Sequence, residues 1–286
     1  MTAMGVYAVT GSASGMGREV ADKLVAQGHR VIGVDLREAD VIADLSIAAG
    51  RREAARKVLQ LADGRLDGAV MAAGLGPAGG KERVNLLAQV NYLGVVELLE
   101  AWRPALAAGG SAKAVVFSSN STTSTPMVPR RTIRALRAKD AGKAVKSLKL
   151  FGRGANALMY AASKIAISQW VRATAVSRDW AGAGIRLNAL APGAIMTPLL
   201  QQQLDNPNEG KMVRRFPVPI GGFGDAGQLA DWVLFMLSDA ANFLCGSVIF
   251  VDGGSDAYFR TDEWPRAVGA RQLWSYQKKF RGFRPY

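Results

Sequence analysis

The sequence predicts an α/β protein with a doubly wound parallel β-sheet and helices on both faces. Short segments, most of them apolar throughout, alternate with longer segments whose apolar residues follow helical spacing. A strand that is apolar throughout is buried on both faces, so this alternation is typical of a parallel sheet covered by helices. The 286 residues, 49% hydrophobic and 21% charged, fit one large domain or two small ones, and neither an internal repeat nor a linker divides them.

The first elements show the pattern. Residues 6–10 form an apolar run that ends at a glycine-rich turn, and the segment from Gly17 to Gln27 has apolar residues at helical spacing, with Gly28 as its stop. Further strands are expected at 30–35, 66–72, 114–118, 185–189 and 248–251, and further helices at 49–61, 85–106, 160–178 and 226–237.

Three segments depart from this alternation. Residues 122–158 predict a helical insert before the helix that begins near Tyr160, and residues 196–225 predict a substrate lid. We expect a single domain over residues 1–256, followed by a basic, aromatic C-terminal extension over 257–286. Because disordered tails are usually poor in aromatic residues, we expect this extension to pack on its own or a neighbouring subunit.

Composition excludes several classes of protein. No stretch has the roughly 20 uninterrupted apolar residues of a membrane span, and the N-terminal residues do not resemble a signal peptide. Cys245 is the only cysteine, so no intramolecular disulfide is expected and a cytoplasmic location is favoured. His29 is the only histidine, which excludes zinc sites of the His/Cys type, and no metal is expected. Acid–base chemistry therefore falls to Tyr, Lys or carboxylate side chains.

The glycine-rich turn, Thr10-Gly-Ser-Ala-Ser-Gly-Met-Gly17, lies between the first strand and the first helix. Its glycines, at 11, 15 and 17, let the backbone turn tightly and approach a pyrophosphate, which the helix N-terminus stabilises. Asp35 follows at the end of the second strand, where a carboxylate accepts hydrogen bonds from a ribose diol and repels a 2′-phosphate. The sequence therefore predicts a Rossmann-type dinucleotide site and favours NAD over NADP, although Arg18 and Arg37 lie nearby.

Tyr160 and Lys164 are one helical turn apart in Tyr-Ala-Ala-Ser-Lys and face the same way. A free phenol titrates near pH ~10, and a nearby ammonium brings its pKa toward the working range. Such a pair is common by chance on helices, so alone it does not indicate a function. The dinucleotide-binding features in the same sequence support a catalytic role for it.

The chain resembles the short-chain dehydrogenase/reductase family over roughly residues 4 to 255. The shared motifs occur in the family's order, and they are Thr10-Gly-x3-Gly-x-Gly17, Asp44-Leu45, Asn91, Ser119, Tyr160-x3-Lys164, Pro192-Gly193 and Asp252-Gly-Gly254.

This resemblance implies roles for individual residues. Tyr160 would exchange a proton with the substrate oxygen, Ser119 would orient that oxygen, Lys164 would hold the nicotinamide ribose and lower the pKa of Tyr160, and Asn91 would anchor a water. Asp44 would reach the adenine. The residues implied in cofactor binding are Gly11, Ser14, Gly15, Met16, Gly17, Asp35, Leu36, Asp44, Leu45, Gly74, Tyr160, Lys164, Pro192, Gly193, Ile195 and Thr197.

Two points qualify the assignment. Where the family usually has Asn-Ala-Gly after its fourth strand, this chain has Ala72-Ala73-Gly74, which we interpret as a structural substitution. Ser118 and Ser121 are alternatives to Ser119 as the catalytic serine.

A closer resemblance is to the branch of bacterial 3α-hydroxysteroid dehydrogenase/carbonyl reductases. It rests on the segment Val34 to Ser46, on Ala73-Gly-Leu-Gly-Pro77, and on the 41 positions between Ser119 and Tyr160, against about a dozen in most of the family. In that branch helical residues are inserted there and cover a face that other members use to form tetramers. The resemblance therefore implies a homo-oligomer, with a dimer favoured and a tetramer possible.

Basic residues gather in the insert and the extension and raise the net charge to +13. A solvated helical face, a substrate-site rim for carboxylated or CoA-linked substrates, and a nucleic-acid or membrane surface are the alternatives for the insert. No known nucleic-acid-binding module accompanies the charge, so nucleic acid is not an expected partner.

We expect an NAD(H)-dependent oxidoreductase that interconverts a secondary alcohol and a ketone, on a hydroxysteroid or another bulky apolar ring. The alternatives are the same chemistry on an anionic aryl, terpenoid or acyl-CoA substrate, and a binding protein that senses the cofactor and uses a basic tail. Intact Ser119, Tyr160 and Lys164 argue against the sensor, which needs no acid–base group.

Overall fold

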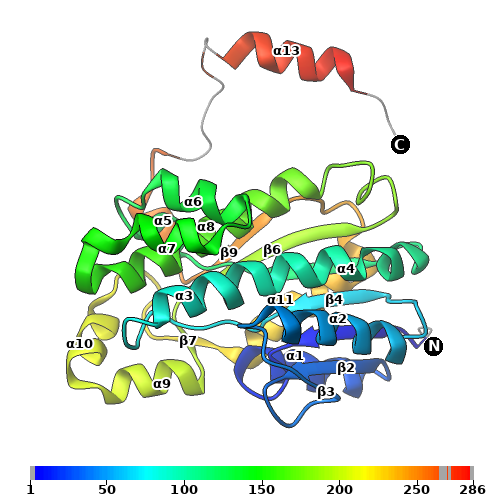
Figure 1. Ribbon diagram of the computed structural model, residues 1–286, viewed down its shortest axis with the longest axis horizontal. Coiled ribbons are helices and arrows are strands. Elements are labelled where there is room, and N and C mark those ends of the chain that lie inside the picture. Colours follow the sequence, from blue (N-terminus) through cyan, green and yellow to red (C-terminus); the bar gives the residue numbers. More distant parts are fainter. Residues whose placement is uncertain (1–3, 264–268, 270–271, 284–286) are drawn as a thin grey trace.

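A seven-stranded parallel sheet forms the centre of the molecule in a computed structural model, which describes residues 4–263, 269 and 272–283 (Figure 1). The strand order is β3-β2-β1-β4-β5-β6-β9. The strands are β1 Val6–Thr10, β2 Arg30–Asp35, β3 Val41–Ile42, β4 Gly68–Met71, β5 Lys113–Phe117, β6 Arg186–Pro192 and β9 Val248–Val251. The predicted doubly wound α/β fold is thus confirmed.

Helices cover both faces of the sheet, as predicted. Helices α1 (Gly15–Ala26) and α11 (Ala226–Leu237) pack on one face, and α2 (Ala48–Leu61), α4 (Gly94–Ala108) and α8 (Ala155–Thr174) pack on the other. Strand β4 shows why a continuous apolar run suits this position: Ala69 and Met71 belong to one buried cluster, whereas Val70 belongs to the other. Alternate side chains of one strand therefore fill two separate cores.

The sheet reverses its winding between β1 and β4. From β1 the chain proceeds outward through β2 to β3, and it then returns to β4 and continues through β5 and β6 to β9. Strand β3 has only two residues, which pair Val34 with Val41 and Asp35 with Ile42, and the sequence pattern did not predict it. In open sheets of this kind, ligands bind outside the carboxyl ends of the strands at the point of reversal.

The predicted helix at 85–106 is a longer and less regular helical segment. Helix α3 (Arg83–Ala88) continues into a π-helical turn, η1 (Gln89–Leu93), before α4 begins. A single π-turn inside an α-helix inserts an extra residue and is frequent at functional sites. Here the irregular turn contains Asn91, one of the four predicted catalytic residues.

The predicted helical insert before the catalytic helix is present. It consists of α5 (Ser121–Ser124), α6 (Arg130–Arg137), α7 (Ala141–Ser147) and the 3-10 turn η2 (Lys149–Gly154). Asp140 caps α7 by accepting from the backbone N–H of Lys143 at 2.7 Å, and Ile133 and Leu136 of α6 are buried in the main core. The insert is therefore an ordered helical layer, and Figure 1 shows it over α8.

The predicted lid contains two short helices. Strand β7 (Ile195–Met196) pairs with β8 (Gly224–Asp225) at its base, and α9 (Pro198–Asp205) and α10 (Pro207–Arg215) lie between them. Thr197 caps α9 through its hydroxyl, which accepts from the N–H of Leu200. The paired strands hold both ends of this segment together. That the segment moves as a lid over the substrate remains a prediction.

A 3-10 turn, η3 (Asp239–Ala241), precedes β9, and α12 (Ser255–Phe259) follows it and leads into the C-terminal extension, which contains α13 (Leu273–Gly282). Figure 1 shows α13 standing clear of the body, and Trp274 and Tyr276 on it are exposed. The expected packing of the extension on its own or a neighbouring subunit remains a prediction. Trp264, Arg266, Arg271, Arg284 and Tyr286 lie outside the described residues.

Candidate active site and dinucleotide cleft

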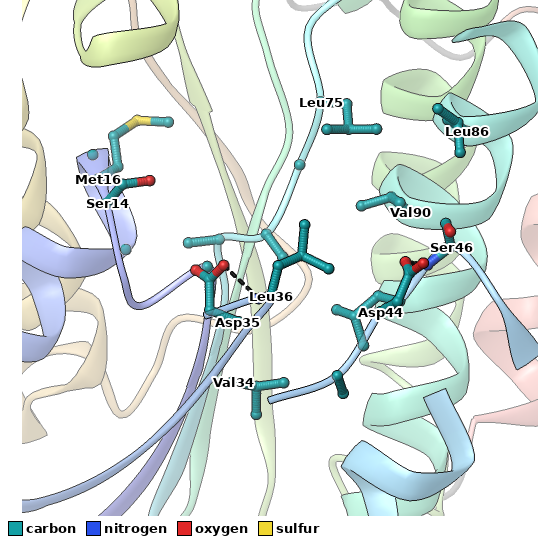
Figure 2. A pocket seen from close by; sticks show the side chains of 18 of the residues that line it. Ser14, Met16, Val34, Asp35, Leu36, Asp44, Ser46, Leu75, Leu86 and Val90 are labelled. Atoms are coloured by element: carbon teal, nitrogen blue, oxygen red, sulfur yellow. Dashed lines mark hydrogen bonds between the residues drawn. The ribbon is translucent and has the colours of Figure 1, made fainter. Parts of the chain in front are cut away.

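A cleft of about 460 Å³ opens at the carboxyl ends of β1, β2 and β4, where the sheet reverses its winding (Figure 2). Most of the predicted cofactor-binding residues line it. These are Gly11, Ser14, Gly15, Met16, Gly17, Asp35, Leu36, Asp44, Leu45, Gly74 and Thr197. Residues far apart in sequence thus converge on a single hollow at the position that parallel sheets use for ligands.

Two glycines of the turn are required by close packing. A Cβ on Gly11, whose φ is +72°, would lie 2.8 Å from the backbone nitrogen of Ala73. A Cβ on Gly17 would lie 2.2 Å from the carbonyl oxygen of Gly11. The turn therefore packs directly on the loop after β4, which brings the backbone of both segments to the cleft wall.

Helix α1 begins at Gly15, directly behind this turn. Ser14 is its N-cap residue in extended conformation, but its side chain makes no capping hydrogen bond. The first-turn amides of α1 therefore keep donors at the positive end of the helix dipole, where an anionic pyrophosphate binds favourably.

Asp35 lies at the far side of the turn and organises it. One carboxylate oxygen accepts from the N–H of Ala13 at 3.0 Å and the other from the N–H of Leu36 at 2.6 Å. Asp44, across the cleft in Figure 2, accepts from the N–H of Ser46 at 2.8 Å. Both carboxylates remain on the cleft wall, so each can still accept from a ligand hydroxyl or amine.

These features fit a dinucleotide. The cleft has a glycine turn that admits backbone close to a phosphate, free helix N-terminal donors, and a carboxylate placed for a ribose diol. Leu75, Leu86 and Val90 give it an apolar wall, and Arg83 adds a cation. Sequence reasoning missed these four as cofactor residues, because Arg83, Leu86 and Val90 lie within an expected helix or its approach, and Leu75 was noted only as part of the segment Ala73-Gly-Leu-Gly-Pro77.

Asn91, Lys164 and Gly74 meet at the inner end of the cleft. The side-chain amide of Asn91 donates to the carbonyl oxygen of Leu75 at 2.9 Å and accepts from its N–H at 2.8 Å. A Cβ on Gly74 would lie 3.6 Å from Oδ1 of Asn91 and 3.9 Å from Nζ of Lys164. The π-turn thus holds the loop after β4 against α8.

Lys164 is almost fully buried, and its ammonium donates to the carbonyl oxygen of Phe117 at 2.8 Å. Nζ lies 5.9 Å from the centroid of the Tyr160 ring. Burial lowers the pKa of Lys164 to about 8, so at neutral pH most of it still carries its charge.

Tyr160 shows a difference from the expectation. Dense packing raises its pKa above 10.0, although its ring keeps some exposure, and the hydrogen bond with Ser119 opposes this shift only in part. Lys164 was expected to lower this pKa, but its Nζ is hydrogen-bonded at the end of β5 and lies over the ring. Burial is therefore the largest effect on the pKa of Tyr160, and the opposing effect comes from Ser119.

The three candidate serines occupy different environments. The hydroxyl of Ser118 bonds to that of Ser168 at 2.7 Å and is thus directed to the back of α8. Ser119 hydrogen-bonds Tyr160 and accepts from the N–H of Ser121 at 3.1 Å, whereas the hydroxyl of Ser121 is buried without a partner among the described residues. The structure therefore favours Ser119 as the serine that acts with Tyr160.

Besides Tyr160 and Lys164, three predicted cofactor residues do not line the cleft itself. Pro192 ends β6, and its carbonyl oxygen accepts from the N–H of Asn120 at 2.9 Å. Gly193 packs so closely on Asp252 that a Cβ would lie 2.8 Å from its Cα, and Ile195 is buried beside the lid base. These residues shape the segment that leads to Thr197, whose side chain lies near Gly15.

The Ala72 substitution has a simple packing role. A Cβ on Gly17 would lie 3.2 Å from the Cβ of Ala72, so Ala72 fills space directly behind the glycine turn. Ala73, next along, donates its N–H to the hydroxyl of Thr10 at 3.1 Å. Among the described residues, no group of three or more metal-ligating side chains occurs, and no helix is long and apolar enough to cross a membrane.

Comparisons with known proteins agree with this geometry. A "short chain dehydrogenase" family model matches residues 5–130, and an "Enoyl-(Acyl carrier protein) reductase" model matches residues 120–256. The chain is 38% identical to 3-alpha-hydroxysteroid dehydrogenase/carbonyl reductase of Comamonas testosteroni, over 91% of this chain and 100% of that protein. It is 33% identical to galactitol 2-dehydrogenase (L-tagatose-forming) of Cereibacter sphaeroides, over 86% of this chain and 93% of that protein.

A solved structure is similar over the same range. The 3-alpha-hydroxysteroid dehydrogenase from Pseudomonas sp. B-0831, complexed with NADH, superposes with a TM-score of 0.84 at 40% identity, covering 91% of this chain and 100% of that one. Motifs, fold and similarity over nearly the whole length lead to one conclusion: the chain belongs to the short-chain dehydrogenase/reductase family and is an oxidoreductase.

Proposed function

We propose that the protein interconverts a secondary alcohol and a ketone with NAD(H), using Tyr160 as the acid–base group. The observation that supports this most directly is that Tyr160 is hydrogen-bonded to Ser119 and lies close to Lys164, whose Nζ lies near Gly74 on the wall of the dinucleotide cleft. With a single histidine in the chain, no other side chain there is as well placed to move a proton.

The residues divide the work as follows. A bound nicotinamide supplies or accepts the hydride. Ser119 orients the substrate oxygen, and Tyr160 donates its phenolic proton to that oxygen during reduction or takes the proton from it during oxidation. The ammonium of Lys164 opposes the desolvation of the tyrosinate, and Asn91 fixes the loop after β4 through both of its bonds to Leu75.

The proposed cofactor is NAD rather than NADP. Asp35 stands where a 2′-phosphate would lie, and its charge favours a free ribose diol. The similar hydroxysteroid dehydrogenase structure contains NADH, which supports the same preference.

The proposed substrate is a hydroxysteroid or another bulky apolar ring. Relatives named for hydroxysteroids are similar over the full length of those proteins, and the lid adds apolar residues to the approach. The exposed cations of the insert favour a second candidate, the same reaction on an anionic aryl, terpenoid or acyl-CoA substrate.

Substitution of Tyr160→Phe tests the proposal. We expect kcat to fall at least about 100-fold, because the proton donor is lost, while NADH binding is retained. Turnover is followed at the NADH absorbance band over a panel of hydroxysteroids, aryl ketones, carboxylated terpenoids and acyl-CoA thioesters. Tyr7→Phe, near the amino end of the interior strand β1, is the matched control. Full turnover by Tyr160→Phe, or no binding of NADH by the native protein, would refute the proposal.

We further propose a homodimer in the cytoplasm. Trp232 and Phe235 form an edge-to-face pair on α11 with both rings exposed, beside the sheet's edge strand β9. An apolar face next to an edge strand is suited to a second copy of the chain. Sizing of the native protein beside a Trp232→Ser, Phe235→Ser variant separates a dimer from a monomer or tetramer, and the cytoplasmic location remains a prediction from the single cysteine.

A further inference from the structure

The outer end of the helical insert combines protruding apolar side chains with cations. Met127 is 89% exposed in the loop before α6, and Leu150 is 93% exposed in η2 after α7. Phe151, next to Leu150, is 39% exposed. Exposed apolar side chains that lie together are unfavourable in water, and such groups often mark a surface that binds a partner.

Hydrogen bonds place these residues at the same end of the insert. Arg131, at the start of α6, donates to the carbonyl oxygen of Ser147, at the end of α7, at 2.9 Å. The hydroxyls of Thr132 and Ser147 bond at 2.6 Å. The loop that carries Met127 therefore lies beside the turn that carries Leu150, although the two are more than twenty residues apart. We call this end the insert tip.

Cations surround the apolar side chains of the insert tip. All of them are exposed, and none forms a salt bridge within the part of the chain that the structure describes. They are Arg130, Arg131, Lys146, Lys149 and Arg153. The nearest carboxylate in the sequence, Asp140, caps α7 at its other end. The insert tip therefore bears uncompensated positive charge around an apolar point.

The backbone of η2 favours this protrusion. Gly152 has φ +50° and breaks the helical path between Lys149 and α8, and a Cβ there would meet nothing within 4 Å. Gly154 likewise has open space around it. The chain thus turns sharply at the surface without packing the turn into the core, and Leu150 and Phe151 project from it.

We propose that the insert tip is a peripheral docking site for an anionic phospholipid surface. Apolar side chains that enter the headgroup region, ringed by Lys and Arg that pair with anionic lipid, are the features of interfacial membrane binding. A nucleic acid would use the cations but leave Met127 and Leu150 exposed to water, so the apolar point favours the lipid.

The location gives the docking site a consequence for catalysis, which rests on the proposed function. Tyr160 lies six residues beyond the end of η2, roughly 9 Å along the axis of α8. Docking through the insert tip would bring the reaction site close to the bilayer, where bulky apolar ring compounds accumulate.

Vesicle co-sedimentation of the full-length protein, without substrate, tests the docking site. The probes are phosphatidylcholine vesicles and vesicles that also contain about 30% phosphatidylglycerol, at about 0.1 M salt. We expect binding to the anionic vesicles only. Leu150→Ser with Phe151→Ser should weaken it at least about tenfold, and Lys146→Ala with Lys149→Ala should weaken it about fivefold for each cation removed.

Matched controls separate the insert tip from other surfaces. Phe243→Ser removes an equally exposed aromatic residue elsewhere, and Lys278→Ala with Lys279→Ala removes two exposed cations from α13. Neither control should change vesicle binding, and thermal unfolding and NADH binding check that every variant is folded.

Two results would overturn the proposal. One is equal or absent binding to the two kinds of vesicle. The other is binding that falls with the controls but not with the insert-tip variants. Salt-sensitive DNA binding that competes with vesicles and survives Leu150→Ser with Phe151→Ser would instead identify a polyanion site. Because substrate is absent from the assay, failure here leaves the proposed oxidoreductase function untouched.

Discussion

Replacing Lys164 with methionine should stabilise the folded protein at neutral pH while impairing its activity. Lys164 is 6% exposed, and burial lowers its pKa from 10.5 to about 8. Each pKa unit corresponds to about 1.4 kcal/mol, so holding this ammonium in the folded protein at pH 7 costs about 3 kcal/mol relative to the unfolded chain. Methionine has similar length and no charge, so it removes that cost.

Loss of a hydrogen bond offsets part of this gain in the free energy of unfolding. The ammonium donates to the carbonyl oxygen of Phe117, and a buried acceptor left unpaired costs about 1–3 kcal/mol. We therefore expect Lys164→Met to raise the free energy of unfolding by about 0 to 2 kcal/mol at pH 7. Catalysis should fall sharply in the same variant, because the charge beside Tyr160 is lost.

The pH dependence gives a sharper measurement. The folded pKa lies below the unfolded one, so the unfolded chain binds more protons between pH 8 and 10.5 and wild-type stability rises with pH in that window. The cost of Lys164 is fully present below pH 8 and falls to less than half of that value by pH 9.5. The advantage of Lys164→Met over wild type should therefore shrink by about 2 kcal/mol between pH 7 and 9.5.

Urea unfolding of both proteins at fixed concentration measures this difference, and other titrating groups cancel because both proteins share them. Two results would refute the reasoning that the buried charge of Lys164 destabilises the folded protein. One is a difference in unfolding free energy that does not change with pH, and the other is a Lys164→Met protein destabilised by more than about 3 kcal/mol at pH 7.

Two further substitutions test the cleft. Gly17→Ala places a Cβ 2.2 Å from the carbonyl of Gly11 and should weaken NADH binding at least about tenfold by displacing the turn, whereas Gly154→Ala, in open space, should leave the fluorescence titration unchanged. Asp35→Asn keeps an acceptor for the N–H of Ala13 but removes the charge, so the preference for NAD over NADP in kcat/KM should fall about tenfold. An unaltered preference would mean that Asp35 does not discriminate between the cofactors.

Much of the fold and the cleft was predictable because local chemistry determines it. Positions 11 and 17 require glycine, because a Cβ there would collide with neighbouring backbone atoms. Strands that are apolar throughout require helices on both faces of the sheet. Such constraints leave a pattern in the sequence that survives tertiary packing.

Other features depend on distant contacts and left no pattern. The π-turn at Asn91 forms because its amide bonds to Leu75, sixteen positions away, and periodicity alone suggested an uninterrupted helix. The raised pKa of Tyr160 reflects how densely the finished structure surrounds it, which the spacing to Lys164 does not reveal. Strand β3 has only two residues, and it is held in the sheet by its pairing with β2.

The strand order has a consequence for how the protein folds. The turn after β1 contacts the loop after β4, and Lys164 of α8 contacts that loop and the end of β5, so these contacts close loops of about fifty to ninety residues. Parallel pairings of such separation form slowly, and no fragment that ends before α8 can assemble the site. Cofactor binding should therefore report on completion of the whole sheet, and added NADH should shift the equilibrium toward that completed state.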